Sequence, residues 1–141
     1  MKYDLRVGSD SRIVINVQGR PSPWANQPHE GAWRQLIAME ATKIKADPFH
    51  PSVRPSRVII EFRMIESRRG DLDNLAKPVL DTLFRQSRSS KFPVSTLFCC
   101  DDFHLPELIL RRVIVHSPEL EGANIVIDLE VPEEITFISG S

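Results

Sequence analysis

The stretch DLDNLAKPVLDTLF, residues 71–84, determines more of the fold than any other part of this sequence. Its apolar side chains recur at helical spacing, at Leu75, Ala76, Val79, Leu80, Leu83 and Phe84. A stripe of this kind packs one face of an amphipathic helix against a core. Asp73 is a favourable N-cap residue, and Pro78 falls within or just beyond the first turn, where its missing amide costs least. The stretch therefore predicts a core helix that starts near Asp73.

Strand and helix patterns alternate on both sides of this helix. Towards the N-terminus, alternating β-branched residues predict strands at 12–18 and 56–66, and apolar residues at helical spacing predict a helix at about 30–46. Towards the C-terminus, residues 108–116 and 123–131 are strand-like, and the short polar segment between them suggests a hairpin. The order β-α-β-α-β-β predicts an α+β fold, with two helices packed on a single mixed β-sheet.

Length and composition define the broad class of the protein. The 141 residues suffice for one compact core, so we expect a single domain over residues 1–141. No apolar run approaches the ~20 residues needed to span a bilayer, and the start of the sequence lacks the apolar stretch of a secretory signal. These features predict a cytoplasmic protein with no membrane partner. The adjacent Cys99 and Cys100 are expected to be reduced thiols without a chemical role.

The charge is unevenly distributed, although its formal sum is only −1. Lys and Arg exceed Asp and Glu by four in residues 54–91, whereas Asp and Glu exceed Lys and Arg by seven in residues 92–141. A basic centre of this kind can contact the phosphates of DNA. The residues expected to do so are Arg68, Arg69, Arg85, Arg88 and Lys91.

Two carboxylates where the strand leads into the helix indicate a metal site. Asp71 and Asp73 are two residues apart, and in an extended segment residues at this spacing point the same way, with Leu72 facing inward. Two nearby carboxylates repel each other unless a positive charge lies between them. Mg²⁺ prefers such oxygen ligands, so the pair predicts a magnesium site. The alternative is that the two acids serve only the turn and the helix start.

Lys77 and Asp81 continue from this pair along the polar side of the helix. Asp73, Lys77 and Asp81 follow one another at intervals of four, so the three share one face. A lysine one turn from paired aspartates can stabilise charge on a phosphate that is being cut. An exposed ion pair that contributes little to stability is the simpler interpretation.

A third carboxylate would complete the site. Asp101 and Asp102 follow a short apolar run. A cluster of three carboxylates is of the sort that supports metal-assisted phosphodiester hydrolysis. Spacing alone does not select between Asp101 and Asp102 as the third member.

Residues 71–83 resemble the central motif of the RusA family of Holliday junction resolvases: Asp-x-Asp-Asn, then Lys, then Asp-x-Leu along a helix. In that family an Asp-Asp pair lies beyond the helix, and its second member joins the catalytic set. The resemblance gives this role to Asp102. It also implies a Mg²⁺-dependent endodeoxyribonuclease, with Mn²⁺ able to substitute. Such an enzyme works as a homodimer that nicks opposing strands of a four-way DNA junction in recombination and repair.

The resemblance also implies a role for each candidate residue. The implied metal ligands are Asp71, Asp73 and Asp102. Lys77 would complete the catalytic set by adding positive charge near the phosphate. Asn74 would orient a ligand or a water, and Asp81 would position Lys77.

Two alternative functions remain open. One is a metal-dependent nuclease with a different preference, such as flaps or replication forks. The other is a structure-specific DNA-binding module that does not cut, in which the aspartates only cap a helix. Titration with magnesium separates them, because a binding-only module should show no carboxylate-dependent metal affinity.

Two further features bear on DNA and on the dimer. Trp24 lies in a proline-rich loop and is compatible both with an ordinary loop position and with stacking on DNA bases. Trp33 falls within a helical apolar pattern that is typical of the core. The apolar run 97–100 and the faces of residues 108–116 are the surfaces expected to form a dimer interface.

Overall fold

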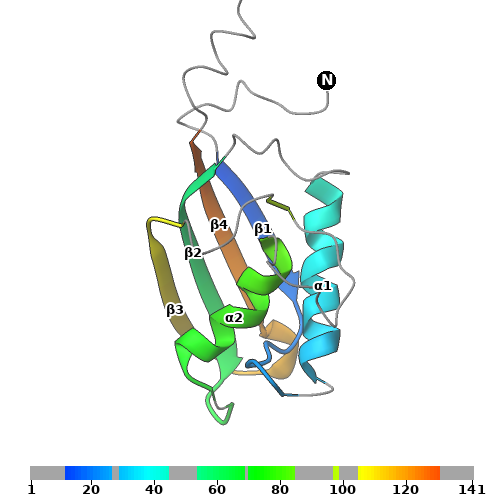
Figure 1. Cartoon of the computed structure of the whole chain (residues 1–141). Helices are drawn as coiled ribbons and strands as arrows, with labels where there is room; N and C mark the ends of the chain where they lie inside the picture. The colour runs from blue at the N-terminus through cyan, green and yellow to red at the C-terminus, as the bar shows by residue number, and fades with distance from the viewer. Residues whose placement is uncertain are drawn as a thin grey trace, which may run out of the picture.

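The computed structural model places two helices on one side of a four-stranded sheet (Figure 1). It describes residues 12–26, 29–44, 54–68, 70–84, 97–98 and 105–130. The elements are β1 (Arg12–Gln18), α1 (His29–Ile44), β2 (Arg54–Ile65), α2 (Leu72–Leu83), β3 (Leu108–Val115), the 3₁₀ helix η3 (Pro118–Leu120) and β4 (Gly122–Glu130). The fold is therefore α+β with a single mixed sheet, as the sequence predicts. Among these helices, none is long and apolar enough to cross a membrane.

The strands lie in the order β1-β4-β2-β3. β4 is antiparallel to both of its neighbours, whereas β2 and β3 are parallel. Parallel neighbours need a crossover connection, and α2 lies within the one between β2 and β3. The start of α2 therefore follows directly from the end of a central strand.

The hairpin expected from the last two strands is wrong. β3 pairs with β2, and β4 lies between β1 and β2. β3 carries Arg111 and Arg112 in its middle and is largely exposed, while β4 alternates buried and half-buried residues. Charged residues suit an edge strand because they discourage pairing with another chain. The connection through η3 instead passes the end of β2, where Arg63 Nε donates to the Leu120 carbonyl at 3.1 Å.

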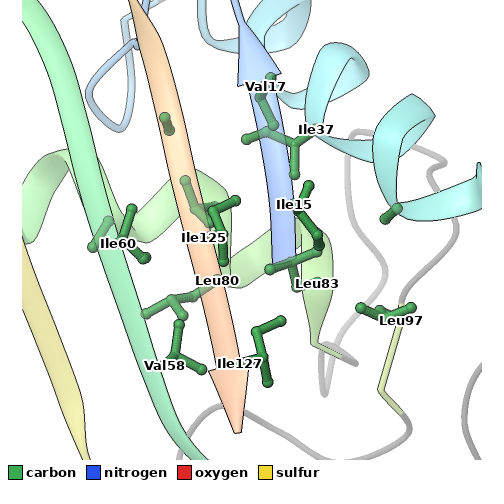
Figure 2. Close-up of a cluster of buried hydrophobic side chains, with 14 of the residues drawn as sticks. Ile15, Val17, Ile37, Val58, Ile60, Leu80, Leu83, Leu97, Ile125 and Ile127 are labelled. Carbon is green, nitrogen blue, oxygen red and sulfur yellow. The ribbon is translucent and has the colours of Figure 1, made fainter. Parts of the chain in front are cut away.

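The core fills the space between the sheet and the two helices (Figure 2). Inward-facing residues of β1, β4 and β2 pack against the apolar stripe of α2 and against α1. The labelled members are Ile15, Val17, Ile37, Val58, Ile60, Leu80, Leu83, Leu97, Ile125 and Ile127. Trp33 is also in this core and is 1% exposed, as predicted.

Leu97 and Phe98 complete this core from outside the regular helices and strands. Both backbone N–H groups donate to the Leu83 carbonyl, at 2.8 and 2.9 Å. The Phe98 ring stacks on Phe84, with the ring centroids 5.1 Å apart. Leu97 and Phe98 are 2% and 0% exposed, so the expectation that this run forms a dimer interface is wrong for these two residues.

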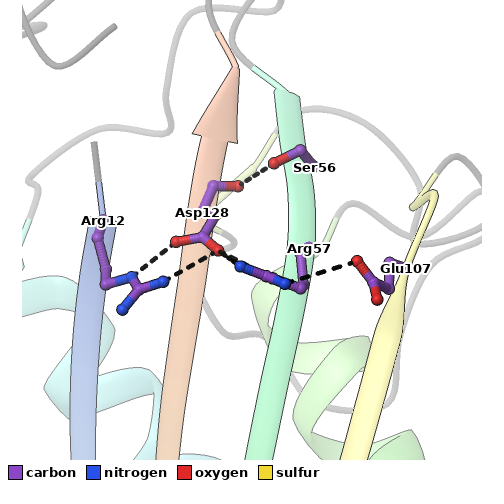
Figure 3. A network of polar contacts seen from close by, with 5 residues as sticks. All are labelled: Arg12, Ser56, Arg57, Glu107 and Asp128. Carbon is purple, nitrogen blue, oxygen red and sulfur yellow. Dashed lines mark hydrogen bonds and ion pairs between the residues drawn. The ribbon is translucent and has the colours of Figure 1, made fainter. Parts of the chain in front are cut away.

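The opposite face of the sheet carries a charged network (Figure 3). Arg12 of β1 and Arg57 of β2 both lie opposite Asp128 of β4. Their guanidinium groups contact its carboxylate at 2.7 and 2.9 Å, and Glu107 lies 3.9 Å from Arg57. This network links three strands near the beginning of β2, whereas α2 follows the other end of that strand.

Candidate active site

Helix α2 begins two residues earlier than the sequence predicts. Its N-cap is Asp71, which has an extended backbone (φ −72°, ψ 151°), and Asp73 already lies in the first turn. The expected capping role of Asp73 is therefore wrong, and so is the extended approach that would have aligned the two carboxylates. Leu72 supplies the reason, because it packs against the core beside Leu75 and Ala76. The helix starts where its apolar stripe starts.

Asp71 and Asp73 both remain exposed at this helix start. Asp71 makes no side-chain cap hydrogen bond, and Asp73 Oδ1 accepts one from the Asn74 backbone N–H at 3.0 Å. Neither carboxylate forms an ion pair with a residue of the described ranges. The partial positive charge of a helix N-terminus stabilises carboxylates at these positions. Both are therefore accessible to a cation from solvent.

The chain enters this helix through a glycine. Gly70 has a φ of +132°, a backbone conformation that other residues rarely adopt. A Cβ at this position would also lie 3.4 Å from the Leu75 side chain. Arg112 of the neighbouring strand β3 donates to the Gly70 carbonyl. Arg112 was not among the residues predicted from the sequence, and its contact holds the residue directly before Asp71.

A cleft of about 500 Å³ opens beside Asp71. The loop after β1, the end of β2 and the start of α2 form it, so segments that are distant in sequence meet here. Its lining residues are Arg20, Pro21, Pro23, Trp24, Asn26, Met64, Ser67, Arg68, Gly70, Asp71 and Asn74. Arg68, Asp71 and Asn74 are thus brought together as predicted site residues, whereas Asp73 lies outside this lining.

A proline inside α2 ties the loop after β1 to this helix. Pro78 lies in the second turn, deeper in the helix than the sequence predicts, because the helix starts at Leu72. Proline has no N–H, so the carbonyl of Asn74, four residues earlier, lacks its usual helical donor. The backbone N–H of Trp24 donates to that carbonyl at 3.0 Å. The proline therefore creates the acceptor that holds the loop against α2.

Buried polar contacts hold the same loop from α1. The Ala25 N–H donates to Glu30 Oε1 at 2.8 Å, and Glu30 is only 3% exposed. Arg34 lies 3.7 Å from Glu30, and its Nε donates to Thr82 Oγ1 at 3.1 Å. Buried charges persist in a protein when they are paired and hydrogen-bonded, and these contacts connect the loop, α1 and α2. The loop is thus fixed from two sides.

Arg68 lines the cleft and also forms an ion pair with the buried Glu121. Its guanidinium donates to the carboxylate of Glu121 at 3.0 Å, and the Ile65 N–H donates to the same group at 3.1 Å. Burial acts to raise the pKa of Glu121, but hydrogen bonds from Arg68 and Ile65 outweigh it, and the pKa is lowered. Arg68 was expected to contact DNA, and part of its hydrogen-bonding capacity is used inside the protein.

Lys77 lies next to Trp24, which lines the cleft. The Lys77 Nζ is 3.6 Å from Asp81 Oδ2, so the contact expected to position this lysine is present. The same nitrogen lies 5.7 Å from the centroid of the Trp24 ring. The Lys77 side chain is 49% exposed, which leaves its ammonium group accessible to an anion.

Several predicted site residues lie outside the described residues: Arg69, Arg85, Arg88, Lys91, Asp101 and Asp102. Within the ranges that the structure describes, no group of three or more His, Cys, Asp or Glu side chains could hold a metal ion. Mg²⁺ is commonly bound through only one or two protein carboxylates, with water and substrate phosphates as its other ligands. The exposed Asp71 and Asp73 fit that mode of binding.

Part of the cleft was not identified from the sequence. Arg20 and Ser67 line it, and neither was a candidate. Arg20 directly precedes the Pro-Ser-Pro-Trp segment, and this clustering of prolines beside a basic and an aromatic residue was the available signal. Loops that a rigid fold holds in place often carry binding residues.

Comparison with known proteins does not assign this site. No protein-family model matches the chain, and a search of curated proteins finds no match. The chemistry of the cleft therefore rests on the residues that form it.

Proposed function

We propose that this chain is a Mg²⁺-dependent endonuclease that cuts branched DNA and, as a homodimer, resolves four-way junctions by paired nicks in recombination and repair. One observation carries the proposal. Asp71 occupies the N-cap of α2, but its carboxylate makes no cap hydrogen bond, and the residue lines a cleft that also holds Arg20, Arg68 and Asn74. A carboxylate that forms no ion pair with the described residues, beside basic side chains, suits a site that binds a cation and a phosphate together.

Four residues near the start of α2 would each have a role in this reaction. Asp71 and Asp73 would hold the metal ion, which when bound activates a water for attack on the phosphodiester and stabilises the leaving oxygen. Asn74 lines the cleft one residue after Asp73, where its amide can orient a water. Lys77 offers an exposed ammonium group one turn further along α2. Such a charge can stabilise the phosphate as its negative charge grows.

The choice of DNA as substrate is supported by the basic residues of the cleft. Arg20 and Arg68 add positive charge at its wall, which favours a phosphate backbone. The preference for four-way junctions and the dimeric state are supported by the resemblance of residues 71–83 to the RusA motif. A two-fold dimer would present two identical sites to the two equivalent strands of a junction.

A nicking assay on a four-way junction with a mobile core, with Mg²⁺ or Mn²⁺, tests this proposal. Asp71→Asn should lose nicking, because the amide keeps the shape of the side chain but not its charge. Glu119→Gln, which changes an exposed carboxylate in η3, is the matched control and should nick like the wild type. Wild-type protein that binds the junction but never nicks it, with either metal, would favour the binding-only module. Preferred nicking of flaps or forks would favour the other nuclease.

A further inference from the structure

We propose that Trp24 is a stacking platform for the exposed face of a nucleobase, and that this residue makes the cleft selective for DNA with an unstacked base. The inference deepens the proposed function, because it rests on DNA as the ligand of this cleft. It concerns recognition and requires no cleavage.

The exposure of Trp24 sets it apart from the other aromatic residues that the structure describes. Its side chain lines the cleft and the residue is 52% exposed. The other aromatic residues of the described ranges are 0–1% exposed: Trp33, Phe62, Phe84 and Phe98. Aromatic side chains bury more apolar area than most, so an indole left in solvent beside a polar cleft forgoes a substantial gain in stability. A ligand that covers the indole would recover that gain.

The backbone holds this indole in a defined place. The Trp24 N–H is fixed by the Asn74 carbonyl that Pro78 leaves without a helical donor. Ala25 follows with a φ of +67°, which a residue other than glycine seldom adopts, and its N–H is fixed by the buried Glu30. Backbone strain that the surrounding structure maintains is common where a site is preorganised for its ligand. The loop thus presents the indole at little further entropic cost.

The neighbours of the ring suit a nucleotide. Lys77 Nζ lies over the indole at 5.7 Å from its centroid, which supplies a positive charge next to a stacking surface. Asp71, Asn74 and Arg20 line the same cleft. A base stacked on Trp24 would therefore bring an adjacent phosphate into the cleft that Asp71 lines.

Only some DNA structures can use such a platform. In a continuous duplex every base is stacked between its neighbours, so its face is not accessible to a protein side chain. Base faces become accessible where stacking is interrupted, at the branch point of a junction, in flaps and in single strands, and aromatic stacking tolerates any base because every base has a π-face. Trp24 would therefore select for distorted or branched DNA without reading sequence.

Tryptophan fluorescence of the full chain, titrated with DNA in the absence of divalent metal, tests the inference. The probes are a four-way junction, a flapped duplex, a single-stranded oligonucleotide and a blunt duplex of equal length. Since Trp33 is 1% exposed, a change in emission on binding reports on Trp24. We expect quenching with the first three probes and little with the blunt duplex.

Three variants, one of them a control, complete the test. Trp24→Ala should weaken binding to the junction roughly tenfold and leave duplex affinity unchanged, whereas Trp24→Phe should retain most of the junction affinity. Met39→Ala, an exposed apolar position on α1, should bind like the wild type. The quenching of the wild type and the Trp24→Phe variant keep the test decisive if Trp24→Ala folds poorly.

The outcomes separate this inference from the proposed function. Unchanged junction affinity in the Trp24 variants, together with no quenching in the wild type, overturns the platform even where the wild type nicks DNA. Quenching and weakened binding without any metal-dependent nicking support the platform and overturn the nuclease. A wild type that binds none of the four probes overturns both.

Discussion

The acidic residues in two regions of this protein differ in whether they form ion pairs. Glu121, behind the cleft, and Asp128, on the other face of the sheet, are each held by arginine side chains. Asp71 and Asp73, at the start of α2, form no ion pair with the described part of the chain, and both are exposed. The contrast indicates that the paired carboxylates stabilise the fold, while the unpaired ones are available to a ligand.

The two paired carboxylates also differ from each other in burial. Glu121 is 1% exposed and is bonded to Arg68, whereas the Asp128 side chain is 18% exposed and its partner Arg12 is 53% exposed. The hydrogen bond from Arg12 lowers the pKa of Asp128, although partial burial opposes the shift. Water screens the more exposed network, so it should contribute less to stability.

The largest expected effect is on DNA cleavage and follows from changing Asp73. Asp73→Asn should lower the nicking rate about a thousandfold, equivalent to about 4 kcal/mol of transition-state stabilisation. Junction binding should remain nearly intact and thermal stability should change little, because this exposed side chain has no paired charge to lose. Gel-shift affinity and nicking rate, measured on the same preparations, check this. Nicking at the wild-type rate would remove Asp73 from the site.

The second largest expected effect is on folding stability. It follows from changing a carboxylate that is paired with arginine, Glu121 or Asp128. Glu121→Gln should lower the free energy of unfolding by about 3 kcal/mol, because it leaves the partly buried Arg68 without its counter-charge. The same type of change on the more exposed network, Asp128→Asn, should cost about 1 kcal/mol. Urea denaturation of both variants gives the comparison. An equal loss in the two would show that burial does not distinguish them.

Acid should weaken the paired groups specifically. The folded-state pKa values of Glu121 and Asp128 lie below their unfolded values, so both residues stabilise the fold above their unfolded pKa. That contribution is lost as the pH falls below about 5 towards the folded pKa. Thermal midpoints measured between pH 7 and pH 3 should fall more steeply in the wild type than in a Glu121→Gln, Asp128→Asn double variant. Parallel curves would argue against this linkage.

The smallest expected effect is on the salt dependence of DNA binding. It follows from changing Arg20, which lines the cleft, or Arg12, which lies on the opposite face of the sheet. Junction affinity should fall at least tenfold between ~50 and ~200 mM salt, because phosphate contacts dominate binding. Arg20→Gln removes a positive charge from the cleft and should lower the slope of this salt dependence by about one. Arg12→Gln, on the opposite face of the sheet, should leave the slope unchanged. Fluorescence anisotropy with a labelled junction measures both, and equal slopes for the two variants would place the DNA elsewhere.

The helices and strands were predictable because their signals are local. The stripe from Leu75 to Phe84 and the alternation in residues 12–18 each specify one element. Strand neighbours depend on contacts between distant residues, and so the position of β4 between β1 and β2 was missed. The start of α2 was also misplaced, because Asp73 was expected to cap the helix, whereas Asp71 occupies the N-cap and Leu72 already packs against the core as a helical residue.

The candidate site was predictable only in part, for a similar reason. The short Asp-x-Asp-Asn spacing identified Asp71, Asp73 and Asn74 as neighbours. The cleft itself depends also on Arg20 and Trp24, which belong to the loop after β1. The hydrogen bond that holds this loop exists because Pro78 removes one donor from the helix, and no sequence pattern names the group that replaces it.

Calorimetric titration with Mn²⁺, in the absence of DNA, measures whether Asp71 and Asp73 bind a metal ion. The wild type and the Asp128→Asn variant should bind the ion with equal affinity, because Asp128 is held by arginine and lies on the opposite face of the sheet. An Asp71→Asn, Asp73→Asn double variant should bind it roughly tenfold more weakly or not at all. Equal Mn²⁺ affinity in all three proteins, or no binding by the wild type, would contradict the assignment of the unpaired aspartates as metal ligands.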